Sequence, residues 1–113
     1  MKAAGDRYSI VKRNVAVVGG ILGLEPEYRR ILEENNLMPR MYNQGRAGLK
    51  EKVEGTDMII LFAGTVSHKM AQIVRKVAGT REIPVVTVRP SSVSALKRFV
   101  GKVLSGNSKG GSL

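Results

Sequence analysis

The chain has 113 residues, 42% of them hydrophobic and 25% charged, which indicates one globular domain with its own core. It contains no cysteine, so disulfide bonds, thiolate metal sites and cysteine nucleophiles are excluded. We expect a cytoplasmic protein, because the longest apolar run, residues 58–63, is too short to span a bilayer and the first residues do not resemble a signal peptide.

Charge is the unusual property of this composition, with 19 basic and 9 acidic residues and a net charge of +10. Residues 1–57 carry 10 basic and 8 acidic side chains, whereas residues 58–113 carry 9 basic side chains and a single acid, Glu82. A one-sided positive field attracts phosphates, nucleic acids or acidic partners. The alternative is a basic surface without such a partner.

The first elements in chain order are a strand and a helix. Residues 1–13 are polar and basic, and we interpret them as a flexible arm. Residues 14–18 form a β-branched run that ends at Gly19-Gly20, which is typical of a buried strand. Glu25-Pro26-Glu27 then begins a helix that ends at Asn35-Asn36. A weaker edge strand is expected over residues 39–42.

The second half of the chain repeats this alternation. A short helix over residues 49–54 precedes the best strand candidate, residues 58–62. An apolar stripe predicts a helix over residues 66–78 that ends at Gly79, followed by a strand over residues 84–88. Ser92 or Ser94 caps a last helix, and residues 105–113 have the composition of a disordered Gly/Ser tail.

Strands that alternate with helices over short connections predict a parallel sheet with right-handed crossovers. We therefore expect one α/β domain over residues 14–104, a small open sheet of four strands in the order 2-1-3-4 with helices on both faces, Rossmann-like or flavodoxin-like. The loops that follow the strands meet at one edge of such a sheet, where open α/β folds bind ligands.

The loop after the first strand, residues 19–23, lies where a dinucleotide-binding loop would be expected. The full fingerprint needs a glycine where Val18 stands and an acid after the second strand, where the chain has Tyr42-Asn43-Gln44. NAD binding is therefore not expected. A tight turn at Gly19-Gly20 and a loop that approaches a phosphate both stay open.

The loops after the third and fourth strands carry hydroxyl and basic side chains. Thr65 or Ser67 can cap a helix, which would place His68 and Lys69 in its first turn, facing the strand ends. As the single histidine, His68 cannot form a histidine metal cluster, and no acidic partner supports a serine triad. Arg89, Ser91 and Ser92 can hold an anion or simply precede a capped helix. The candidate contacts to a nucleic-acid backbone are Lys69, Lys76, Lys97, Arg98 and Lys102, with solvent-exposed helix faces as the alternative.

Several of these segments resemble a bacterial family catalogued as domain of unknown function 2325. They are residues 15–20 (Val-Ala-Val-Val-Gly-Gly), Tyr28-Arg29, residues 65–68 (Thr-Val-Ser-His), Lys76 and residues 83–86 (Ile-Pro-Val-Val). The resemblance covers roughly residues 14–100 and implies a small Rossmann-like domain, with candidate site positions Gly19, Gly20, Tyr28, Ser67, His68 and Lys76. Family members often carry an acid where this chain has Gly64 or Thr65, so an acid-dependent mechanism is not transferred.

The residues support three hypotheses, and the first of them assigns no catalytic residue and no metal and leaves the cofactor open. The first is a non-enzymatic module that binds nucleic acid or a nucleotide-like phosphate ligand at the strand-exit edge. The second is a small-ligand or redox-linked sensor that acts through oligomerisation, as a homodimer. The third is a phosphate-ester enzyme with His68 as acid or base. The ligand-binding candidates of the first hypothesis are Gly19, Gly20, Tyr28, Ser67, His68, Arg89, Ser91 and Ser92.

Overall fold

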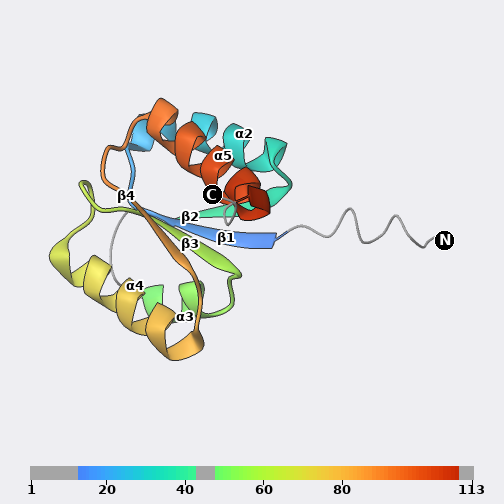
Figure 1. Cartoon of the computed structure of the whole chain (residues 1–113). Helices are drawn as coiled ribbons and strands as arrows, with labels where there is room; N and C mark the ends of the chain where they lie inside the picture. The colour runs from blue at the N-terminus through green and yellow to red at the C-terminus, as the bar shows by residue number, and fades with distance from the viewer. Residues whose placement is uncertain (1–12, 43–47, 110–113) are drawn as a thin grey trace.

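A computed structural model of the chain describes residues 13–42 and 48–109, with side chains as far as Lys102 (Figure 1). The elements are β1 (Arg13–Val18), the 3-10 turn η1 (Leu22–Leu24), α2 (Glu25–Glu34), β2 (Leu37–Tyr42), α3 (Leu49–Glu54), β3 (Met58–Phe62), α4 (His68–Arg81), β4 (Val85–Val88) and α5 (Val93–Lys109). Within these ranges, no helix is both long and apolar enough to cross a membrane.

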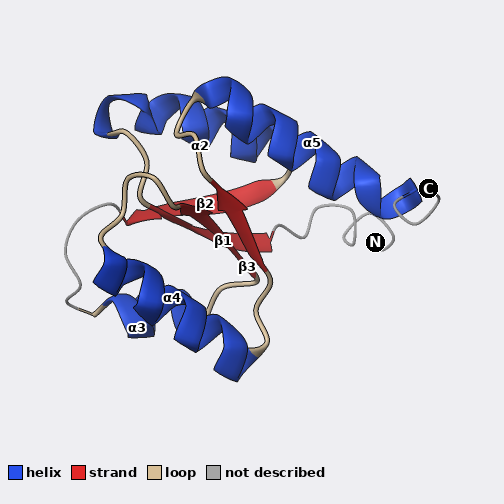
Figure 2. Ribbon diagram, turned by 60° about the vertical axis from the view of Figure 1, so that its left-hand side comes forward, coloured by secondary structure: helices blue, strands red, loops and turns tan. Residues whose placement is uncertain are grey.

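The four strands form one parallel sheet in the order β2-β1-β3-β4, which confirms the predicted topology. Helices α2 and α5 cover one face, and α3 and α4 cover the other (Figure 2). Alternate residues of β1 enter the two layers, with Val15 and Val17 beneath α2 and α5, and Ala16 and Val18 against α3 and α4. The central strands are therefore apolar on both faces, which explains their uninterrupted hydrophobic runs.

Helix α4 extends past its predicted end. Gly79 lies inside the helix, which continues to Arg81 and ends at Glu82, a residue with a left-handed φ of 57°. The Ile83 N–H donates to the Ala78 carbonyl at 2.9 Å and closes the last turn. A glycine near a helix end costs only about 1 kcal/mol relative to alanine, so the buried apolar face of α4 overrides it.

The predicted tail also differs from the structure. Helix α5 includes the backbone of residues 105–109, which we expected to be disordered. No proline follows Ser92, so the glycines and serines of this segment weaken the helix without interrupting its hydrogen bonds. Arg13, placed in the predicted arm, is the first residue of β1, while residues 1–12 and 110–113 lie outside the described residues.

Candidate functional site

The backbone N–H groups that follow β1, at residues 19–21, all donate hydrogen bonds within the protein. Their acceptors are the Tyr42 carbonyl at 2.9 Å, the Thr65 Oγ1 at 2.7 Å and the Tyr28 hydroxyl at 3.0 Å. A phosphate-binding loop instead points its N–H groups at the ligand. Of the two interpretations left open by the sequence, this geometry favours the tight turn.

Packing explains why this turn contains two glycines. Gly19 and Gly20 have φ angles of +92° and +98°, which L side chains rarely adopt. A Cβ atom on Gly19 would lie 2.5 Å from Val66 Cγ1, and one on Gly20 would lie 2.8 Å from Tyr28 Cε2. The glycines therefore bring the turn into direct contact with neighbouring side chains.

Tyr28 joins the turn to the loop after β4. Its side chain is fully buried, and its ring stacks on Phe62 with 4.8 Å between the centroids. The hydroxyl accepts from the Ile21 N–H and donates to the Ser91 carbonyl at 2.5 Å. A buried tyrosine hydroxyl needs such partners, and here they fix α2 relative to the start of α5.

Thr65 completes this arrangement, which we call the strand-exit junction and define as Gly19, Gly20, Tyr28, Thr65 and Ser91. Its Oγ1 accepts from the Gly20 N–H and lies 3.2 Å from the Ser91 Oγ. The sequence suggested Thr65 only as a possible helix cap. The available signal was its place three residues after β3, on the strand that pairs directly with β1.

The two serines predicted at helix starts act as caps. Ser67 Oγ accepts from the Met70 N–H at 3.1 Å, and Ser92 Oγ accepts from the Ala95 N–H at 3.2 Å. Each satisfies a backbone donor that the first helical turn leaves unpaired. Both residues are exposed, and among the described residues neither hydroxyl takes part in the junction's hydrogen bonds.

Among the described residues, His68 forms no hydrogen bond with the strand-exit junction. It is the first residue of α4 and is exposed, with its Nε2 atom 3.4 Å from the Gln72 Nε2 one turn further along the helix. Lys69 and Lys76 are also exposed on α4. Lys76 lines a groove of about 390 Å³ between α3 and α4. None of these three side chains takes part in the junction's hydrogen bonds among the described residues.

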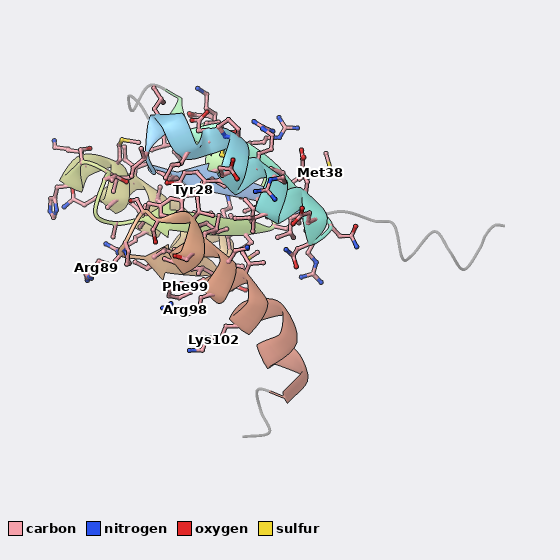
Figure 3. All side chains as sticks on the ribbon, turned by 90° about the horizontal axis from the view of Figure 1, so that it is seen from above. Tyr28, Met38, Arg89, Arg98, Phe99 and Lys102 are labelled. Carbon is pink, nitrogen blue, oxygen red and sulfur yellow. The ribbon has the colours of Figure 1, made fainter. Side chains whose placement is uncertain are left out.

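Three basic residues follow β4 or lie on α5, namely Arg89, Arg98 and Lys102, and we call them the basic row. Figure 3 shows all three projecting on one side of the molecule, where α5 faces away from α2. All three are exposed, and none forms an ion pair with another described residue. Lys97 is a further exposed cation on α5.

Two basic residues elsewhere in the described part of the chain form ion pairs with neighbouring acids. On α2, Arg30 pairs with Glu27 and with Glu34, and the hydrogen bond and charge of Glu27 raise the pKa of Arg30 above its ordinary value. Arg81 at the end of α4 pairs with Glu54 of α3 at 3.1 Å. The basic row differs from these two sites because no acidic side chain pairs with it among the described residues.

The fold converts the charge difference between the halves of the chain into a difference between two sides of the molecule. Residues 13–42 and 48–57 build β1, α2, β2 and α3 and carry six basic and seven acidic side chains. Residues 58–109 build β3, α4, β4 and α5 and carry nine basic side chains against one acid. Since α2 packs on β2 and α5 on β4, the positive charge belongs to the β3–β4 side.

No group of three His, Cys, Asp or Glu side chains gathers as metal ligands would in the described part of the chain. A family model described as an uncharacterized protein conserved in bacteria, domain of unknown function 2325, matches residues 14–103. No match was found among curated proteins or among solved structures. The matched region contains the sheet except Arg13, helices α2, α3 and α4 and most of α5, and the chain therefore belongs to the bacterial family of domain of unknown function 2325.

Proposed function

We propose that this domain binds the phosphate backbone of nucleic acid through the basic row, without an enzymatic reaction. The observation that carries the proposal is the accumulation of exposed, unpaired cations on the side of the molecule that has a single acid. Arg and Lys contacts to phosphates supply most of the affinity in sequence-independent binding. The row lies along α5 and continues to Arg89 at the end of β4, so it offers several contacts to an extended polyanion.

The strand-exit junction supports this function by positioning the row. The bond from the Tyr28 hydroxyl to the Ser91 carbonyl fixes the loop that carries Arg89, and Ser92 caps α5 directly after it. A helix held in this way presents Arg98 at a defined place. The junction itself is a poor site for a phosphate, because its N–H donors already have acceptors inside the protein.

The chemistry of the row also predicts what kind of binding to expect. Phe99, the aromatic residue on α5, is packed against the core and does not form a platform for stacking bases. We therefore expect contacts to phosphates rather than to base edges. The affinity should depend strongly on salt and weakly on base sequence.

Two charge-reversal variants test the proposal. Arg98→Glu/Lys102→Glu changes the basic row, and Arg40→Glu/Lys50→Glu makes the same change in net charge on exposed residues of β2 and α3. Fluorescence anisotropy with a labelled duplex and a labelled single strand at low salt measures binding. We expect the first variant to lose affinity at least about tenfold and the second to stay within about threefold of wild type.

A control with equal total charge is needed because net charge alone changes the attraction to any polyanion. Equal losses in both variants would assign the effect to the overall field and reject the row as the site. Absence of binding by the wild-type protein at low salt would reject the proposed function altogether.

A further inference from the structure

The two edge strands of the sheet, β2 and β4, differ in how well they are protected against pairing with another strand. The Gly19 N–H donates to the Tyr42 carbonyl, so the backbone groups of Tyr42 face β1. Because backbone groups alternate in direction along a strand, those of Leu37, Pro39 and Met41 point away from β1. Pro39 has no N–H, and its carbonyl lies 3.5 Å from Nη1 of Arg29. Proline at an outward position is a common way to prevent further strand pairing.

The edge of β4 has no such protection. The Ile59 N–H donates to the Pro84 carbonyl at 2.9 Å, and the Ala63 N–H donates to the Val88 carbonyl at 3.0 Å. Because backbone groups alternate in direction along a strand, the even-numbered residues of β4 face β3, and the N–H and C=O groups of Val85 and Thr87 point away from it. No described residue outside the ladder forms a hydrogen bond with them. The strand reads Val-Val-Thr-Val and carries no charge, and Thr87 is exposed. A short uncharged edge of this kind can pair with another strand.

We propose that β4 pairs antiparallel with β4 of a second copy of this chain, which joins the two sheets into one of eight strands. Pairing of β4 with β2 of a neighbouring copy would add further copies without end. Pro39, which has no N–H, and Arg29, which lies at the Pro39 carbonyl, oppose this pairing. Pairing of β4 with itself uses the same surface on both protomers and closes as a two-fold dimer. Outward-facing groups then meet, with Val85 opposite the partner's Thr87.

Charge at the two ends of β4 fits this antiparallel arrangement. Glu82, the one acid among residues 58–109, lies before the strand, and Arg89 directly follows it. Both are exposed. Antiparallel pairing brings Arg89 near Glu82 of the partner subunit at each end of the new pair of strands. The rest of the two β3–β4 sides are positive and repel each other, so screening by salt should strengthen the dimer.

Sedimentation equilibrium of the full chain tests the proposal. The dimer dissociation constant should fall when NaCl is raised from about 50 to about 500 mM, the opposite of the response expected for nucleic-acid binding. Thr87→Pro removes the outward N–H, and Thr87→Val keeps it. We expect Thr87→Pro to weaken the dimer at least about tenfold and Thr87→Val to leave it within about threefold.

A charge exchange provides the second test and remains informative if Thr87→Pro does not fold. Glu82→Arg should weaken the dimer, whereas Glu33→Arg, the same change on α2, should not. Glu82→Arg/Arg89→Glu restores both the net charge and the proposed pair, so its dissociation constant should return to the wild-type value. A wild-type protein that is monomeric at both salt concentrations, a dimer insensitive to Thr87→Pro, or a charge exchange that does not restore association would overturn the proposal.

Dimerisation and nucleic-acid binding can fail separately in these experiments. The dimer is measured with protein alone, and the proposed function is measured with Arg98 and Lys102 variants whose β4 edge is unchanged. A monomer that binds nucleic acid would reject only the dimer, and a dimer without affinity for nucleic acid would reject only the proposed function.

Discussion

At the scale of single residues, Gly20 is a position in the turn after β1 that has no room for a side chain. A Cβ there would lie 2.8 Å from Tyr28 Cε2 and 3.2 Å from Phe62 Cδ2, on a backbone with φ of +98°. The two rings are stacked and buried and cannot both move away. We expect Gly20→Ala to lower the free energy of unfolding by about 2–4 kcal/mol, from strain in φ and from overpacking.

Gly23, three residues further along the same loop, provides the matched control. Nothing lies within 4 Å of a Cβ built on it, and its φ is not in the positive range. Gly23→Ala should change the free energy of unfolding by less than about 1 kcal/mol, in either direction. Urea denaturation measures the free energy of unfolding of both variants, and the m-value should stay unchanged. Equal stabilities would show that the turn adapts to a side chain.

The residues of the strand-exit junction show where prediction from the sequence ended. The local pattern indicated a tight turn at Gly19-Gly20 as one of two interpretations, and Tyr28 was named as a candidate ligand-binding residue. The sequence did not reveal that the turn donates to Thr65 or that the Tyr28 hydroxyl reaches Ser91, since these partners are 45 and 63 residues away in the chain. Local spacing does not determine which loops meet at a sheet edge.

At the scale of elements, the sequence left two serines as candidates for the cap of α5, and the structure assigns the cap to Ser92. Its Oγ accepts from the Ala95 N–H, while Ser94 lies within the first turn of the helix and is exposed. Ser92→Ala should lower the free energy of unfolding by about 1 kcal/mol, whereas Ser94→Ala should leave it unchanged or slightly higher. Thermal denaturation of the two variants measures the difference. A larger loss from Ser94→Ala would contradict the assignment.

The strands were predicted better than the helix ends for a physical reason. β1 and β3 are buried on both faces, so each forms a short continuous apolar run bounded by polar or small residues. The ends of α4 and α5 depend on differences in helix propensity of about 1 kcal/mol per residue, and tertiary packing can outweigh differences of this size. Gly79 illustrates this, because it follows the buried Ala78 and does not end the helix.

At the scale of the whole molecule, the strand order determines where the excess positive charge lies. With the order β2-β1-β3-β4, the second half of the chain occupies one side of the sheet, so a difference along the sequence becomes a difference in space. The sequence predicted both the order and the excess of cations. It gave no indication that Lys76 and the basic row lie apart, because that separation depends on which face of α4 and of α5 each residue occupies.

This separation leads to a prediction about the salt dependence of nucleic-acid binding. Each lysine that neutralises a phosphate contributes a slope of about −0.7 to −0.9 to the logarithm of affinity against the logarithm of salt concentration. Lys102→Gln should therefore reduce the magnitude of the slope by nearly one, because Lys102 belongs to the basic row. Lys50→Gln removes the same charge from α3 and should leave the slope nearly unchanged. Anisotropy titrations at four or more salt concentrations give both slopes, and equal slopes for the two variants would show that the charge acts without a localised contact.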